Sequence, residues 1–188
     1  MVNVNITDSG KIIRDHDEVC GFLGKRNIRY ERWDISKISS SERTQEAILA
    51  TFNEEIENIS NKGGYTTADV INIDPKTPNL ESMLEKFKRE HRHSEDEVRF
   101  IIDGSGIFFI DTEQNEVFSV EVEPGDLLSV PAGTKHWFDL CQDRHIIAIR
   151  LFQDRSGWIP LYTGSGIDGK YEPVCFGLSY IGNHGDSP

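Results

Sequence analysis

The feature that most constrains the fold is a series of short apolar segments that begins at residue 87. Turn residues separate these segments, as in Asp103-Gly104-Ser105-Gly106 and Pro131-Ala132-Gly133. Short strands at this spacing are typical of an antiparallel sandwich or barrel. The segments that we expect to be strands are 87–93, 97–103, 106–111, 116–122, 127–130, 136–140 and 145–152. The sequence therefore predicts an all-β dominated fold for this region.

A helical pattern precedes the strands. Apolar residues recur along one helical face at spacings of four, four and three, at Ile48, Phe52, Ile56 and Ile59. A capping box formed by Ser39 and Glu42, or a simple N-cap at Ser41, would begin this helix, and Gly63-Gly64 would end it. We then expect a strand over 65–73 and a second, short helix that opens at Thr77-Pro78.

The length of 188 residues fits one domain better than two. We expect a single domain over residues 1–188. Residues 1–86 would supply N-terminal strands and helices that cover the barrel, and residues 87–152 would form the barrel core. Residues 153–188, which are rich in glycine, would form a C-terminal segment that wraps around it.

The charge and the apolar runs exclude several classes of partner. The net charge is −12, and both a nucleic-acid binder and a protein of anionic membrane surfaces need a basic surface, so neither is expected. No apolar run approaches the roughly 20 residues needed to cross a bilayer. Residues 1–11 also lack the pattern of a secretory signal. We therefore expect a cytoplasmic protein, and a monomer because no long apolar surface stripe remains.

The three cysteines, Cys20, Cys141 and Cys175, are odd in number, widely spaced and without a CxxC pair. This pattern argues against a disulfide framework and for a reducing compartment. We expect each of them to be a small buried hydrophobic residue.

The chemistry of the chain is concentrated in His91-Arg-His93 and in Glu97, four residues later. Residues two apart on a strand point to the same face, so both imidazoles can point inward. The intervening Ser94-Glu95-Asp96 can turn the chain, so that the carboxylate of Glu97 points at the same place. Imidazole nitrogens and a carboxylate oxygen are donors that iron, nickel, manganese and zinc accept. A pair of exposed strand histidines is the alternative.

Arg99 lies two residues after Glu97 and shares its face. It is either one half of a surface salt bridge or a fixed cation beside the metal. In the second case it would fix the Glu97 carboxylate or hold an anionic substrate.

A second group lies about forty residues further on. The turn Pro131-Ala132-Gly133 delivers His136 to the start of the following strand, after another turn at Pro124-Gly125-Asp126. One histidine after a turn is a weak signal by itself. His136, however, follows Glu97 at the distance expected when the chain passes once from one sheet to the other.

These residues resemble the two cupin motifs. His91-x-His93-x3-Glu97-x6-Gly104 is similar to the first motif, and Gly125-x5-Pro131-x-Gly133-x2-His136 is similar to the second. Glu85 departs from the usual Gly at the start of the first motif, and Leu140 from the frequent Asn at the end of the second. Neither position ligates a metal, so these departures bear on turn geometry alone.

Within the cupins, the chain is similar to the acireductone dioxygenases of methionine salvage. The similarity covers most of the chain and is sharpest over residues 87–138, while residues 1–31 and 165–188 match poorly. The segments that carry it are Phe87 to Arg99, Val130 to Phe138, Arg32-Trp33, and Trp158 to Gly164. The resemblance implies a cupin barrel, also called a double-stranded β-helix or jelly roll, with N-terminal helices.

The resemblance also implies an activity. The family oxidises the acireductone 1,2-dihydroxy-3-keto-5-methylthiopentene with O2. It forms 2-keto-4-methylthiobutyrate and formate with Fe(II), and methylthiopropionate, formate and CO with Ni(II). Carried onto this chain, it implies one Fe(II) or Ni(II), held by His91, His93, Glu97 and His136.

We assign catalytic roles to Glu97 and Arg99. A substrate pocket would include Arg99 and the aromatic residues Phe87, Phe138 and Trp158, which resemble the family's pocket, and core packing is the alternative for each of these rings. Two other functions stay open at this point. One is another metal-dependent cupin enzyme, a different dioxygenase or an isomerase, and the other is a cupin that binds a small molecule without catalysis.

Overall fold

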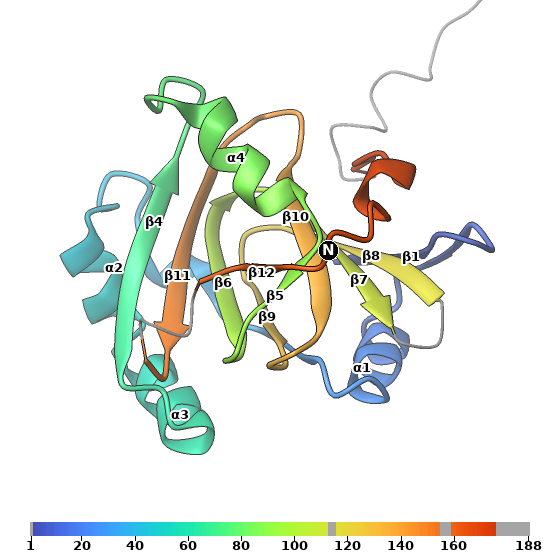
Figure 1. Ribbon diagram of the computed structural model, residues 1–188. Helices are drawn as coiled ribbons and strands as arrows, with labels where there is room; N and C mark the ends of the chain where they lie inside the picture. The colour runs from blue at the N-terminus through green and yellow to red at the C-terminus, as the bar shows by residue number, and fades with distance from the viewer. Residues whose placement is uncertain (1, 113–115, 155–158, 176–188) are drawn as a thin grey trace, which may run out of the picture.

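The computed structural model describes residues 2–112, 116–154 and 159–175 (Figure 1). Two antiparallel sheets form the body of the protein. In order across the larger sheet, its strands are β12 (Leu161–Tyr162), β5 (His91–Arg92), β10 (Lys135–Leu140), β7 (Gly106–Thr112), β8 (Glu116–Val122), β1 (Asn3–Ile6) and β2 (Lys11–Ile13). The smaller sheet runs β3 (Arg29–Arg32), β9 (Asp126–Val130), β6 (Glu97–Gly104), β11 (Ile146–Phe152) and β4 (Thr67–Ile73). This confirms the sheet-dominated architecture with helices near the N-terminus.

Among the described residues, helices lie around the sheets (Figure 1). They are α1 (His16–Gly24), α2 (Gln45–Thr51), α3 (Asn53–Gly63) and α4 (Leu80–Lys88), with short 3-10 turns at Ile35–Lys37 and Asp168–Lys170. α2 packs on β4, α1 on β3, and α4 on β10. None of the helices in the described ranges is both long and apolar enough to pass through a bilayer.

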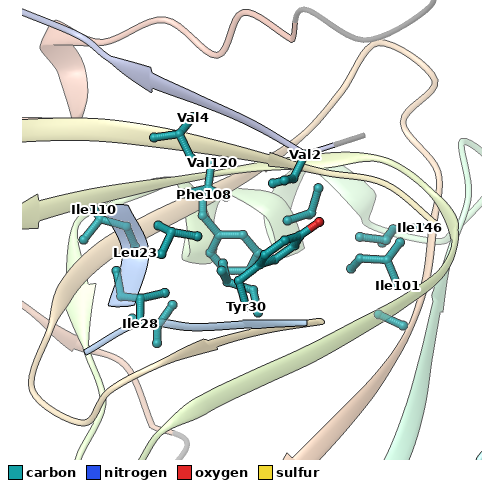
Figure 2. Close-up of a cluster of buried hydrophobic side chains, with 14 of the residues drawn as sticks. Val2, Val4, Leu23, Ile28, Tyr30, Ile101, Phe108, Ile110, Val120 and Ile146 are labelled. Atoms are coloured by element: carbon teal, nitrogen blue, oxygen red, sulfur yellow. The ribbon is translucent and has the colours of Figure 1, made fainter. Parts of the chain in front are cut away.

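The strands are buried on both faces because their two sets of side chains enter different apolar clusters. Ile101 and Phe108 point into the space between the sheets, where Figure 2 shows them with Tyr30 and Val120. Phe100 of β6 points to the other side, against Phe52. Strict alternation along β6 therefore places Glu97, Arg99 and Ile101 together on the inner face.

The N-terminal part forms barrel wall as well as cover. β1 pairs with β8, and β3 pairs with β9, so the first 32 residues extend both sheets. Val2 and Val4 are fully buried in the central cluster (Figure 2). Strands were expected in the N-terminal part, but their positions were not, because each is only three or four residues long and mixes apolar with polar or charged residues.

The helix expected between Ser39 and Gly63 differs at its start and in its middle. It begins after Thr44, whose side chain accepts a hydrogen bond from Ala47 N, so both predicted caps, at Ser39 and at Ser41, are wrong. The backbone bends at Phe52 and divides the segment into α2 and α3, but hydrogen bonds from Phe52 N to Ile48 O and from Ile56 N to Phe52 O continue through the bend. The predicted end is confirmed, since Gly64 has a left-handed φ of 71°.

Residues 87–93 were expected to be one strand, and that prediction is wrong. Helix α4 continues to Lys88 because Phe87 extends the apolar stripe of Leu80 and Leu84, and β5 is left with two residues. α4 also begins later than predicted. Thr77 accepts a hydrogen bond from Asp74 N in the preceding turn, and the N-cap is Asn79.

The expectation of unpaired cysteines is also wrong. A disulfide joins Cys141, directly after β10, to Cys175, and Cys20 is the free cysteine among the described residues. The two partners lie 34 residues apart in sequence. They meet because the C-terminal segment folds back on the outer face of the larger sheet, where Ile167 and Tyr171 pack beside Cys175. The cysteine pattern therefore no longer supports a reducing compartment.

Gly104 links β6 to β7 at a place where no other residue fits. Its φ is 73°, and a Cβ added there would lie 1.9 Å from the backbone oxygen of His145. We expect Gly104→Ala to lower the free energy of unfolding by more than about 3 kcal/mol. Gly10→Ala is the matched control, since Gly10 has a φ of 65° with nothing within 4 Å, and strain alone should cost about 1 to 2 kcal/mol. The free energy of unfolding is measured by urea denaturation, and an equal decrease in the two variants would contradict the role assigned to the His145 contact.

Candidate metal centre

Four side chains from three strands and one turn converge inside the barrel. His91 lies on β5, and His93 is the first residue after that strand. Glu97 begins β6, and His136 lies on β10. Their donor atoms all lie within 4.8 Å of one another, and all four residues are buried. The sequence predicted this set, and the structure brings all of it together.

Pairing between β5 and β10 aligns two of the histidines. His91 and His136 are direct cross-strand partners, with ring centroids 4.6 Å apart. His93 lies beyond the end of β5, yet its ring centroid is 4.9 Å from that of His91 and 5.4 Å from that of His136. The three imidazoles therefore face one another although only two of them lie on strands.

Two hydrogen bonds fasten the turn after His93 to the loop before His136. Gly133 N donates to His93 O at 2.8 Å, and Ala132 N donates to the Asp96 carboxylate at 2.9 Å. Asp96 also accepts a hydrogen bond from the Tyr65 hydroxyl at 2.8 Å. Asp96 was not singled out from the sequence, where it is one of three polar residues in a turn.

Backbone carbonyls orient two of the imidazoles. The Nδ1 atom of His91 lies 2.7 Å from Arg89 O, and that of His136 lies 2.9 Å from Thr134 O. A carbonyl only accepts, so each Nδ1 donates, and each Nε2 is the ring nitrogen that would give its lone pair to a metal.

Glu97 is the common neighbour of the cluster. Its Oε2 atom lies 3.1 Å from His93 Nε2 and 3.0 Å from His136 Nε2. Its Oε1 atom lies 2.9 Å from Arg99 Nη2. One carboxylate oxygen therefore faces the imidazoles while the other is held by the guanidinium group.

The electrostatics of the cluster favour a bound cation. Burial lowers the pKa of His91 to about 4, with the neighbouring His136 adding to the effect, so His91 is neutral at pH 7. Burial alone would raise the pKa of Glu97, but Arg99, followed by hydrogen bonds from His136 and His93, holds it well below its usual range. At neutral pH the site thus offers one carboxylate and at least one neutral imidazole, the protonation states that metal binding needs.

A narrow cavity of about 40 Å³ opens beside the cluster. His91, Glu97 and Arg99 line its polar end. The remaining wall is apolar and comes from β4, α4, β6, β7, β10 and β11, as Ile71, Ile73, Leu84, Phe87, Ile101, Phe108, Phe138, Ile146 and Ala148. Phe87 and Phe138, two of the predicted pocket residues, thus line this cavity, whereas Trp158 lies outside the described residues.

The C-terminal segment is held beside the metal cluster by Glu90. This carboxylate is buried next to His91 and accepts hydrogen bonds from the hydroxyls of Thr163 and Ser165. Just before them, Tyr162 of β12 pairs with His91 of β5. No sequence pattern indicated this contact, because Glu90 precedes the motif and its partners lie more than seventy residues away.

Two comparisons of the sequence agree with this geometry. A sequence profile of the ARD/ARD' family matches residues 14–160. The acireductone dioxygenase of Exiguobacterium sibiricum is 39% identical over 176 residues, which cover 89% of this chain and 98% of that protein. The acireductone dioxygenase of Bacillus cytotoxicus is 42% identical over 170 residues, which cover 86% of this chain and all of that protein.

A comparison of structures gives the same result. The solved acireductone dioxygenase of Bacillus anthracis, described with a cadmium ion in its active centre, matches with a TM-score of 0.83 and 40% sequence identity. The match covers 86% of this chain and 98% of that one. The predicted cupin fold is thereby confirmed.

The metal cluster can be separated from the other histidines by substitution. We expect His136→Ala to lose the bound metal, because it removes one of four donors. His145→Ala is the control, since His145 contacts Ile73 O and Asp103 away from the cluster and its loss should leave the metal content unchanged. Elemental analysis of the two purified variants measures their metal content. Equal loss of metal in His136→Ala and His145→Ala would contradict the assignment of His136 as a ligand.

A pH titration tests the role of Arg99. Because Arg99 holds down the pKa of Glu97, Arg99→Gln should raise it, so that protons compete with the metal at higher pH. We expect metal affinity to fall more steeply between pH 8 and pH 6 in Arg99→Gln than in the unaltered protein. Lys135→Gln, which removes a cation that faces Asp111, should keep the original slope. Identical slopes for all three proteins would refute the coupling.

Proposed function

This chain belongs to the ARD/ARD' family, and from that premise we propose that it is a metal-dependent dioxygenase that cleaves an acireductone with O2 in methionine salvage. The substrate would be 1,2-dihydroxy-3-keto-5-methylthiopentene. The observation that carries the proposal is the convergence of three imidazoles and one carboxylate at the polar end of an apolar cavity.

The donor set fits a divalent transition metal. Nitrogen and oxygen donors are accepted by both iron and nickel, and the four residues leave positions of an octahedron for other ligands. We propose that His91, His93, Glu97 and His136 hold one Fe(II) or Ni(II) per chain. When bound, the metal would supply Lewis-acid chemistry to the enediol oxygens of the substrate.

The charges of the chain's own residues suit an anionic enediol. With three neutral imidazoles and one carboxylate, a divalent cation keeps one net positive charge, and Arg99 adds a second close by. A doubly deprotonated enediol would balance both. Arg99 would therefore act in two ways: it holds Oε1 of Glu97 in place, and its charge favours the substrate anion.

The apolar part of the cavity would receive the methylthioalkyl chain of the substrate. Phe87 and Phe138 contribute aromatic surface to it, and Ile71 and Ala148 contribute aliphatic surface. These walls would also exclude water from the reacting carbons. Trp158 is proposed as a further member of this pocket on the basis of the family resemblance alone.

The four proposed ligands are the same for either metal. We propose that iron directs the reaction to 2-keto-4-methylthiobutyrate and formate, and that nickel directs it to methylthiopropionate, formate and CO. The support is the family resemblance together with a donor set that both metals accept.

We further propose a single cupin domain over residues 1–188 that works as a monomer in the cytoplasm. Strands from the N-terminal part lie in both sheets, which supports one domain over two. The net charge of −12 and the short apolar runs support the location and argue against membranes and nucleic acids as partners.

The activity is tested directly with metal-loaded protein. An acireductone generated without oxygen should lose its ultraviolet absorbance after O2 and enzyme are added, far faster than in the enzyme-free reaction. Iron-loaded protein should yield no CO, and nickel-loaded protein should yield CO and formate. An absorbance decay equal to background with either metal would refute the substrate assignment.

The pocket is tested by filling it. Ala148 lines the cavity and is 1% exposed, and Ala148→Leu adds three carbons at this position. Because the larger side chain would fill part of the cavity, kcat/KM should fall roughly tenfold or more. The metal content should be unchanged, because Ala148 contributes no ligand. For an acireductone with a shorter alkyl chain, the same substitution should lower kcat/KM by a smaller factor. Equal losses for both substrates would show that the tail lies elsewhere.

A further inference from the structure

A second group of metal-ligating side chains lies on the outer face of the larger sheet, apart from the centre described above. It consists of Glu121 on β8, Cys141 after β10, and Cys175 on the C-terminal segment. Their donor atoms lie within 4.8 Å of one another. Figure 1 shows the C-terminal segment, in orange and red, passing from β12 toward this side of the sheet.

The chemistry of the group depends on the redox state of the two sulfurs. As a disulfide, Cys141 and Cys175 are poor ligands. As thiolates, they are strong ligands for thiophilic ions such as Zn²⁺, and the carboxylate of Glu121 is a third donor. A tetrahedral ion with bonds of about 2.3 Å to sulfur and about 2.0 Å to oxygen spaces its donors about 3.5 to 3.8 Å apart. Side-chain rotations after reduction would bring the three donors to that spacing.

Apolar packing would keep the two thiols together after reduction. Ile167 and Tyr171 pack on the outer face of the sheet, where the Tyr171 ring lies 6.0 Å from Trp137 and 6.3 Å from Phe109. These contacts do not involve the sulfurs. Cys175 should therefore remain near Cys141 when the covalent bond is absent.

Glu121 contributes an oxygen donor that the strand holds in place. Its side chain is largely buried, at 8% exposure, and it accepts a hydrogen bond from the amide of Asn3 at 3.3 Å. A carboxylate oxygen beside two thiolates completes a set of three donors that a divalent cation accepts.

We propose that the reduced form of this protein binds a thiophilic divalent cation, such as Zn²⁺, through Glu121, Cys141 and Cys175. Two molecules of a thiol reductant would convert the disulfide into two thiols and would themselves become a disulfide. The cation would then displace the two thiol protons and form two metal–sulfur bonds, with water in the fourth position. The bound ion would fasten the C-terminal segment to the sheet in place of the disulfide.

Cobalt provides a test that separates this site from the histidine-rich centre. Co²⁺ bound to thiolate absorbs in the near ultraviolet by sulfur-to-metal charge transfer, and the first centre contains no sulfur. Protein reduced with a phosphine and desalted under nitrogen should bind two Co²⁺ per chain and show this absorption. Oxidised protein should bind one and lack it. All proteins should carry Cys20→Ser, which removes the free thiol near His16.

Two further variants assign the ligands. Cys175→Ser should abolish the sulfur-to-cobalt absorption and leave one Co²⁺ per chain. Glu121→Gln has nearly the same shape, so it should fold, and it should weaken binding at the second site roughly tenfold or more. No absorption in the reduced protein, or absorption that survives Cys175→Ser, would overturn the site. Unchanged affinity in Glu121→Gln would overturn the three-donor assignment.

Discussion

The arrangement of the metal centre depends on one buried carboxylate. Glu97 presents one oxygen to the imidazoles of His93 and His136 and the other to Arg99. Burial would normally protonate such a group, and Arg99 prevents this by holding its pKa far down. An ionised carboxylate in turn favours a cation at the imidazoles. The inner face of β6 thereby supplies both a ligand and the charge that keeps it ionised.

The fold makes this arrangement possible because its central strands are buried on both sides. On β6 the outward residues, such as Phe100, pack against Phe52 and anchor the strand, and the inward residues are free to form the site. The inner surface changes from polar to apolar within one strand, from Glu97 and Arg99 to Ile101. A cavity with a charged end and an apolar end follows directly from that order of residues.

The sequence predicted the parts of the protein that depend on local spacing. The strands after residue 97 and the four candidate ligands were found because turns and motifs are short-range patterns. The prediction was wrong at Phe87, which fits two local patterns: it begins an apolar segment that was expected to be a strand, but it also continues the helical stripe of Leu80 and Leu84, and helix α4 includes it. It also missed contacts between distant residues, namely the Cys141–Cys175 disulfide and the hydrogen bonds from Thr163 and Ser165 to Glu90. No spacing rule connects residues that meet only because a terminal segment folds back.

That segment connects the two groups of metal-ligating side chains. At one end, β12 pairs with β5, which has two residues and carries His91. Glu90, the neighbour of His91, accepts hydrogen bonds from the hydroxyls that follow β12. At the other end, Cys175 joins the segment to Cys141 on the outer face of the sheet. Because β5 is so short, its position depends on both of its neighbours, β10 and β12. One segment therefore borders His91 at one end and carries Cys175 at the other.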